Sequence, residues 1–92
     1  MNKSEKRILI AEDQEMLKEM LATVLGDEDY LVSTAENGDV ARQLLDSQAF
    51  NLVLTDLYMP IMNGIDLILY TQTQLPNTKT ILLIHSRKPL LR

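Results

Sequence analysis

The sequence predicts an α/β fold with a doubly wound parallel sheet. Apolar runs of strand length alternate with segments of helical periodicity, which is the pattern of repeated βαβ units. The strand-like runs are apolar almost throughout, as expected for strands covered on both faces. The 92 residues, 46% hydrophobic and 24% charged, suit one small globular unit. We therefore expect a single domain over residues 1–92.

The first half of the chain predicts two strands and two helices. Residues 8–11 form the first strand, and from Gln14 to a stop at Gly26 apolar residues recur at helical spacing. Residues 30–35 form the second strand. Asn37 and the glycine after it supply a turn and an N-cap for the second helix. The apolar stripe of the first helix comprises Met16, Leu17, Met20, Leu21, Val24 and Leu25.

The second half predicts two more strands around a third helix. Residues 50–55 form the third strand, and Pro60 and Gly64 mark the loop after it. A helix is expected over residues 65–75, and residues 80–85 form the fourth strand. Too few residues follow for another helix and strand, so the sheet is expected to stop there.

Composition excludes several classes of function. A net charge of −4 with scattered basic residues argues against direct nucleic-acid binding, which needs clustered Lys and Arg. The absence of cysteine rules out disulfides and thiolate metal sites and is compatible with the cytoplasm, where we expect the protein. The apolar stretches are too short for a membrane span, so no membrane association is expected.

Acidic residues end two of the predicted strands. Glu12 and Asp13 close the first strand, and Asp56 closes the third. One such acid alone is more often a helix cap or a solvated loop residue. Neighbouring parallel strands, however, open their carboxyl ends on one edge of the sheet, where α/β proteins place ligands. The three carboxylates together therefore predict a site, and Mg²⁺ is the cation that such oxygens suit.

A carboxylate at this position can also act as a nucleophile toward a phosphoryl group. The product would be an acyl phosphate, with a metal neutralising charge on the transferring oxygens. The residues allow Asp56 to take this role, with Asp13 and Asp56 binding Mg²⁺.

Three features carry a family resemblance. The first is the apolar strand and acid pair of residues 8–13, and the second is the Asp-x-x-Met-Pro-x-Met-x-Gly run of residues 56–64. The third is Ser86, a hydroxyl residue ending the fourth strand. Together they resemble the receiver domain of two-component response regulators, most strongly over residues 6–86. The resemblance implies a flavodoxin-like sheet of order 2-1-3-4-5, here without the fifth strand and the last helices.

The resemblance also implies a function for each site residue. Asp56 would accept a phosphoryl group from a sensor histidine kinase or a histidine phosphotransfer protein. Asp13 and Asp56 would hold Mg²⁺, with Glu12 assisting and the backbone carbonyl of Tyr58 as a further ligand. Ser86 would be the switch hydroxyl that bonds the phosphoryl group. The chain would then be a phosphorelay signalling domain and not an enzyme, apart from self-catalysed phosphotransfer and autodephosphorylation.

The end of the chain departs from the family pattern. Receivers carry a phosphoryl-pairing lysine on the fifth strand, and Lys88 followed by Pro89 resembles the Lys-Pro pair found after that strand. Lys88 lies two residues beyond Ser86, within reach of the site, although the following proline favours a direction away from it. A contact to the phosphoryl group and a solvated tail lysine both stay open.

The shortened sheet also predicts self-association. The fourth strand becomes an edge, and its apolar residues 81–84 lack an outer neighbour. Exposed apolar edges seek partners. We therefore expect a homodimer or a domain swap through the fourth-strand edge.

Two other functions remain open. The chain could be a phosphorylation-deficient, receiver-like module for interaction or dimerisation, or a fragment of a DNA-binding response regulator. An aspartyl-phosphate phosphatase is disfavoured, because Tyr58 stands where that chemistry needs a second acid.

Overall fold

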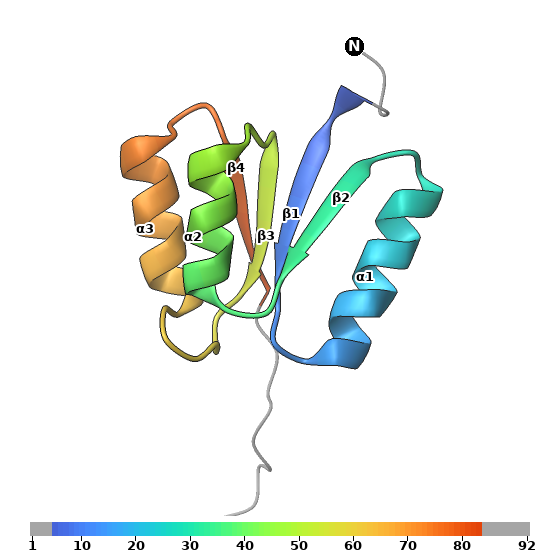
Figure 1. Cartoon of the computed structure of the whole chain (residues 1–92), viewed down its shortest axis with the longest axis horizontal. Helices are drawn as coiled ribbons and strands as arrows, with labels where there is room; N and C mark the ends of the chain where they lie inside the picture. Colours follow the sequence, from blue (N-terminus) through green and yellow to red (C-terminus); the bar gives the residue numbers. More distant parts are fainter. Residues whose placement is uncertain (1–4, 84–92) are drawn as a thin grey trace, which may run out of the picture.

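The computed structural model describes residues 5–83, in which strands and helices alternate along the chain (Figure 1). Each element is five to thirteen residues long. The elements are β1 (Arg7–Ala11), α1 (Glu15–Asp27), β2 (Leu31–Ala35), α2 (Gly38–Ser47), β3 (Leu52–Asp56), α3 (Gly64–Gln74) and β4 (Lys79–Leu83).

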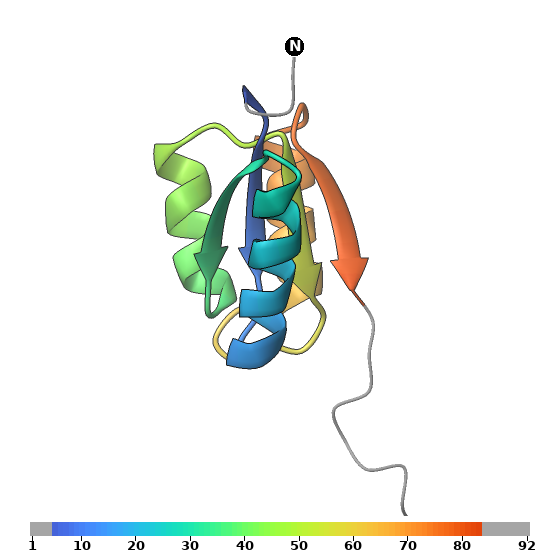
Figure 2. The same ribbon diagram turned by 90° about the vertical axis from the view of Figure 1, so that its right-hand side faces the viewer.

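The four strands form one parallel sheet of order β2-β1-β3-β4. Helices α2 and α3 cover one face, and α1 lies on the other (Figure 1). This is the doubly wound α/β fold that the sequence predicts. The order of the four strands agrees with the expected order 2-1-3-4. In the view rotated by 90°, β4 lies at the edge of the sheet (Figure 2).

The hydrophobic core lies between the sheet and helices α2 and α3. Leu9 and Val53, on neighbouring central strands, and Leu67 of α3 are fully buried. The apolar cluster comprises Leu9, Ala11, Ala35, Ala41, Leu45, Phe50, Val53, Met59 and Leu67. Burial of these side chains, worth about 1.5–3 kcal/mol for each large one, fixes α2 and α3 on this face.

Helix α1 is less buried than its sequence predicts. The stripe predicted to pack inward includes Met16, Met20 and Val24, yet their side chains are 82%, 57% and 56% exposed. None of the residues of α1 is buried. The apolar stripe is wider than the surface that one helix presents to β1 and β2, so only part of it reaches the sheet.

Helix boundaries follow local hydrogen bonding. Asn37 is the N-cap of α2, as predicted, and its Oδ1 accepts a hydrogen bond from Val40 N at 2.8 Å. The prediction that Gly26 ends the first helix is wrong, because α1 continues to Asp27. The chain instead reverses at Asp29, which has φ of 72°, a conformation that Asp tolerates through local hydrogen bonding.

Each of the four strands differs from its predicted bounds by one or two residues; β1 begins at Arg7, β2 begins at Leu31 and β3 ends at Asp56. The third strand begins at Leu52, not at residue 50, and Phe50 is instead a buried core residue of the preceding loop. The fourth strand begins one residue earlier than predicted, at Lys79. Its predicted end, Ser86 and Lys88 all lie outside the described residues.

Helices α2 and α3 are also joined by polar contacts. The Tyr70 hydroxyl of α3 donates a hydrogen bond to the Asp46 carboxylate of α2, and Arg42 pairs with the same carboxylate at 3.2 Å. The hydrogen bond to Asp46 raises the pKa of Tyr70 above its ordinary value, because ionisation of the phenol would remove the donated proton. The Tyr70 hydrogen bond joins the two helices that lead into and out of β3, and the Arg42 pair lies within α2.

Candidate functional site

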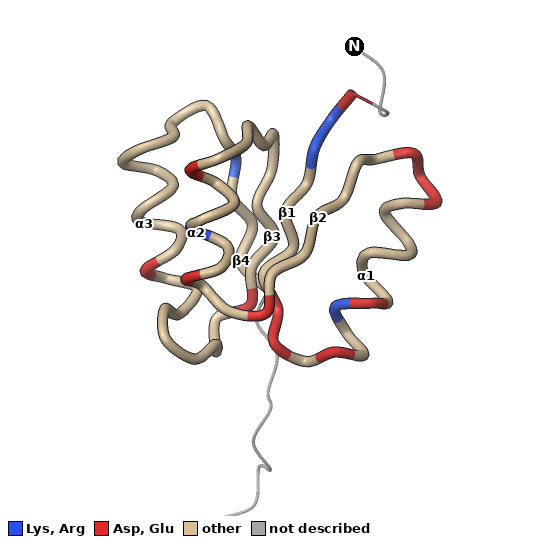
Figure 3. Tube along the Cα trace, in the orientation of Figure 1, with Lys and Arg blue, Asp and Glu red and all other residues tan. Residues whose placement is uncertain are grey.

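The three acids singled out in the sequence converge at the carboxyl edge of the sheet. Oxygen atoms of Glu12, Asp13 and Asp56 all lie within 4.8 Å of one another. Glu12 and Asp56 are fully buried, and Asp13 is partly exposed. Several acidic residues, drawn red in Figure 3, lie where the strands end. The predicted meeting of these side chains is therefore confirmed in position.

Strand register brings the acids together. Ala11 of β1 pairs with Thr55 of β3, so the next residues, Glu12 and Asp56, lie side by side at the carboxyl edge of the sheet. The backbone holds Glu12 in place, because its N–H donates to Ala35 O at 3.0 Å. Its Oε2 accepts a hydrogen bond from Gln14 N at 2.9 Å, at the start of α1.

The loop between β3 and α3 forms the other wall of the site. Gly64 N donates to Leu57 O at 3.0 Å and closes the loop on itself. Asn63 caps α3, with its Oδ1 accepting a hydrogen bond from Asp66 N at 2.9 Å. Both ends of the loop are thereby fixed, one to the strand that carries Asp56 and one to a helix N-terminus.

Two glycines allow close backbone contacts around this loop. An ideal Cβ on Gly64 would lie 2.1 Å from the carbonyl oxygen of Asp56, and one on Gly38 would lie 2.0 Å from that of Met62. No side chain fits at such distances. The start of α3 therefore packs directly on the end of β3, and the start of α2 packs directly on the loop.

The loop contains a strained turn at Ile61. This residue has φ of 73°, and Met62 N donates to Pro60 O at 2.8 Å across it, as in a γ-turn with positive φ. A β-branched residue in this region is a conformational outlier. Its side chain is 80% exposed, so packing contributes little to holding it there. Strain of this kind is often found in functional loops.

Replacing Ile61 by Gly is expected to stabilise the fold. Relief of the left-handed conformation is worth about 1–2 kcal/mol, and the added freedom of the unfolded chain offsets about half of it. The free energy of unfolding in urea should rise by about 0.5–1 kcal/mol. Asp29→Gly is the matched control, since Asp29 has the same φ and Asp tolerates it better, so its gain should be smaller. A loss of stability in Ile61→Gly would show that the exposed side chain makes a needed contact.

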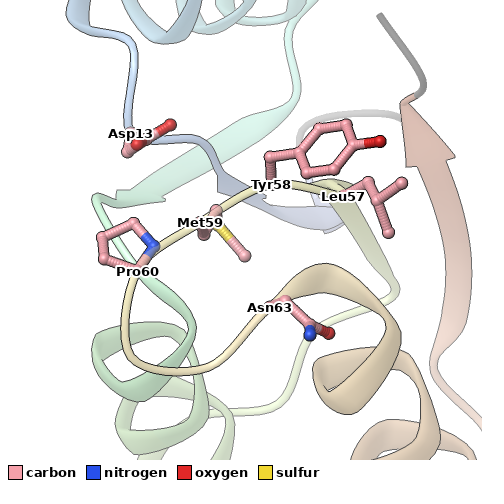
Figure 4. Close-up of a pocket in the computed structure, with 6 residues that line it drawn as sticks. All are labelled: Asp13, Leu57, Tyr58, Met59, Pro60 and Asn63. Carbon is pink, nitrogen blue, oxygen red and sulfur yellow. The ribbon is translucent and has the colours of Figure 1, made fainter. Parts of the chain in front are cut away.

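An open pocket of about 490 Å³ lies beside the acids. Asp13 faces it from the end of β1, across from the loop that follows β3 (Figure 4). The other lining residues are Leu57, Tyr58, Met59, Pro60 and Asn63. Tyr58, predicted as a ligand through its backbone carbonyl, thus borders the same pocket as Asp13. A small polar group from solvent can approach the carboxylates here.

The side chains present fit a hard divalent cation. Carboxylate oxygens are the ligands that Mg²⁺ prefers, and one or two of them with water and phosphate oxygens suffice. Three carboxylates this close repel one another, and a dication would offset that repulsion. Asp13 lines the pocket, whereas the carboxylates of Glu12 and Asp56 are buried close to it.

Sequence reasoning missed two features of the site. The sequence predicts only a turn at Gly38, and no pattern in it indicates the contact with Met62. The sequence also contains no indication of the positive φ at Ile61, because β-branched residues rarely adopt that conformation. Ser86 and Lys88 lie outside the described residues, so the structure does not place them.

The fold and site define a class: a doubly wound α/β domain with a carboxylate cluster at its carboxyl edge. The family model of the response regulator receiver domain matches residues 8–89. The chain therefore belongs to the response regulator receiver family. Receiver domains are signalling domains, and the predicted resemblance to them is confirmed.

Curated relatives agree with this assignment. The chain is 42% identical over 62 residues to the response regulator receiver protein CpdR of Brucella abortus, covering 67% of this chain and 52% of CpdR. It is 36% identical over 75 residues to PilR of Pseudomonas aeruginosa, covering 82% of this chain and 17% of PilR. The chain thus spans about half the length of CpdR and far less of PilR.

Solved structures share the fold. A signal receiver domain of an HD domain-containing protein from Pseudomonas fluorescens has a TM-score of 0.84 at 30% identity, with 90% of this chain and 66% of that chain covered. Response regulator TrrA of Thermotoga maritima, in complex with Mg²⁺-BeF, has a TM-score of 0.81 at 34% identity, with 84% and 67% covered. A complex of histidine kinase ThkA with TrrA matches with a TM-score of 0.80 at 33% identity, covering 92% and 76%.

Within residues 5–83, the helices are all too short or too polar to cross a lipid bilayer.

Proposed function

We propose that the chain is a phosphorelay receiver in which Asp56 accepts a phosphoryl group from a histidine kinase or a histidine phosphotransfer protein. The observation that carries this proposal is the convergence of Glu12, Asp13 and Asp56 beside an open pocket. Membership of the receiver family supports the reaction type.

The transfer exchanges one bond of the phosphorus for another. An Asp56 carboxylate oxygen attacks the phosphorus of a phosphohistidine, the P–O bond forms and the P–N bond breaks. The imidazole of the donor leaves with the electron pair and takes up a proton, and Asp56 becomes an acyl phosphate. When bound by Asp13, Asp56 and the Tyr58 carbonyl, Mg²⁺ would neutralise charge on the phosphoryl oxygens.

The residues around Asp56 have separate tasks in this proposal. Glu12 assists the metal site from its buried position, held by the backbone of Gln14. Gly64 positions the Asp56 backbone by direct contact. Ser86 bonds the phosphoryl group as the switch hydroxyl, and Lys88 is the candidate for a cationic contact to it. A hydrogen bond that forms only in the phosphorylated protein would shift the conformational equilibrium toward the phosphorylated form.

The partners follow from the donor chemistry. The complex of ThkA with TrrA supports a histidine kinase partner, and the Mg²⁺-BeF complex of TrrA supports magnesium. We further propose a cytoplasmic location, where such kinases present their phosphohistidine. Association through the β4 edge as a homodimer or domain swap stays a prediction, and so does the absence of direct nucleic-acid binding.

Replacing Asp13 by Ala is expected to weaken Mg²⁺ binding by about tenfold or more. The change removes one of few charged ligands, and the loss of one such ligand is worth at least about 1.4 kcal/mol. Isothermal titration calorimetry with MgCl₂ measures the affinity. Glu36→Ala is the matched control, because Glu36 is an exposed acid just after β2, outside the carboxylate cluster. Equal affinity in wild type and Asp13→Ala would place the metal elsewhere.

A receiver-like interaction module without phosphorylation is the second candidate. Native mass spectrometry with Mg²⁺ and acetyl phosphate separates the two functions. A phosphoryl adduct on the folded chain supports the receiver, and a folded chain without any adduct supports the module.

A further inference from the structure

Thr55 is a fully buried polar residue on the side of β3 that also carries Val53 of the hydrophobic core. A hydroxyl group in such surroundings costs free energy unless it has a hydrogen-bond partner. The Thr55 hydroxyl donates to the backbone carbonyl oxygen of Asp56 at 3.0 Å. The buried hydroxyl of this strand therefore contacts the backbone of the proposed phosphoacceptor.

Gly64 contacts the same carbonyl group. An ideal Cβ on Gly64 would lie 2.1 Å from the carbonyl oxygen of Asp56, and Gly64 N donates to Leu57 O, one peptide further along, at 3.0 Å. A peptide unit is planar, so a contact that fixes its oxygen fixes the orientation of the whole unit. Thr55 and Gly64 together therefore set the orientation of the two peptide units that follow Asp56.

These two peptide units connect two groups that the proposed function places on one metal ion. The Asp56 side chain precedes them and the Tyr58 carbonyl follows them, where the chain leaves β3 and borders the pocket (Figure 4). Mg²⁺ requires nearly octahedral ligands at short distances. Rotation of either unit would move one of these ligands relative to the other.

We propose that Thr55 is a positioning residue of the phosphoacceptor site. Its hydroxyl orients the peptide after Asp56 so that the Asp56 carboxylate and the Tyr58 carbonyl can bind one Mg²⁺ ion. This inference rests on the proposed function of Asp56. Successive side chains of a strand point to opposite sides, so Thr55 acts through the backbone of Asp56 and not on the phosphoryl group itself.

Thr71 of α3 provides a matched comparison. It is also fully buried, and its hydroxyl also donates to a backbone carbonyl, that of Leu67, at 2.8 Å. This hydrogen bond lies within α3 and outside the carboxylate cluster. Thr55→Val and Thr71→Val therefore make the same chemical change, and only the first removes a hydrogen bond to Asp56.

Two measurements on the full chain test the proposal. Isothermal titration calorimetry with MgCl₂ alone gives the Mg²⁺ affinity, and mass spectrometry over time with Mg²⁺ and acetyl phosphate gives the rate of adduct formation. Thr55→Val should weaken Mg²⁺ binding severalfold and slow adduct formation about tenfold, because small misplacements of reacting groups are costly. Thr71→Val should keep the wild-type values. Urea unfolding should show a loss of stability in both variants, since each leaves a buried carbonyl without a donor.

A second pair of variants isolates the hydroxyl if Thr55→Val fails to fold. Thr55→Ser and Thr55→Ala differ only in the hydroxyl group, and both are smaller than the native side chain, so neither overpacks the core. The serine variant should bind Mg²⁺ more tightly and form the adduct faster than the alanine variant. Circular dichroism confirms that each variant is folded.

Equal Mg²⁺ affinities and equal rates within these pairs would overturn the inference. A loss in Thr71→Val as large as that in Thr55→Val would also overturn it, because any buried hydroxyl would then have the same effect. Failure of the proposed function looks different: wild type binds Mg²⁺ but forms no adduct. The Mg²⁺ affinities then still decide whether Thr55 positions the metal ligands. A wild-type chain that does not bind Mg²⁺ would overturn both proposals.

Discussion

Replacing Asp56 by Asn is expected to abolish acyl phosphate formation. The amide lacks the anionic oxygen that attacks phosphorus, while its size and shape match those of the carboxyl group. Native mass spectrometry with Mg²⁺ and acetyl phosphate should show the phosphoryl adduct on wild type and none on the variant. Asp66→Asn, an exposed position in the first turn of α3, is the control and should keep the adduct.

The same variant should keep its fold and gain stability when no metal is added. Asp56 and Glu12 are both fully buried within the carboxylate cluster, so removing one charge reduces their repulsion. Urea unfolding should therefore give an equal or higher free energy for Asp56→Asn than for wild type. A persistent adduct on this variant would refute Asp56 as the phosphoacceptor, and unfolding of the variant would refute the repulsion argument.

Replacing Gly64 by Ala is expected to destabilise the fold by about 2–3 kcal/mol, as overpacked sites commonly do. The new methyl group would lie 2.1 Å from the carbonyl oxygen of Asp56, and backbone at a strand end cannot move aside as a flexible side chain can. The shift also displaces the Asp56 side chain, so the rate of phosphorylation should fall as well. Urea unfolding and the rate of adduct formation measure the two effects.

Gly26→Ala is the matched control for this substitution. A Cβ at Gly26 meets nothing within 4 Å, and the residue lies inside α1. Alanine there should stabilise the helix by about 0.5–1 kcal/mol, because glycine has more freedom to lose on folding. If Gly64→Ala proved as stable as wild type, the close contact between α3 and the end of β3 would not exist in solution.

The sequence by itself determined the elements and the likeness to receivers. Strand and helix alternate with clear changes of period, and Asn37 is a cap residue whose role depends on neighbours along the chain. The prediction that Glu12, Asp13 and Asp56 meet followed from the acids at the strand ends and from the expectation that these strands are parallel neighbours. Parallel neighbouring strands place the residues after them at one edge, and the register of β1 with β3 confirms it.

Other features depended on contacts between distant parts of the chain. The stripe of α1 indicates an apolar face, but only the width of sheet beneath the helix decides that Met16 and Met20 stay exposed. Gly38 contacts Met62, which lies far along the chain, so no local pattern could reveal it. Ile61 holds a positive φ because the loop is anchored at both ends, which overrides its intrinsic preference. Local propensity thus set the elements and the acidic edge, and tertiary packing decided which surfaces stay open and which residues carry strain.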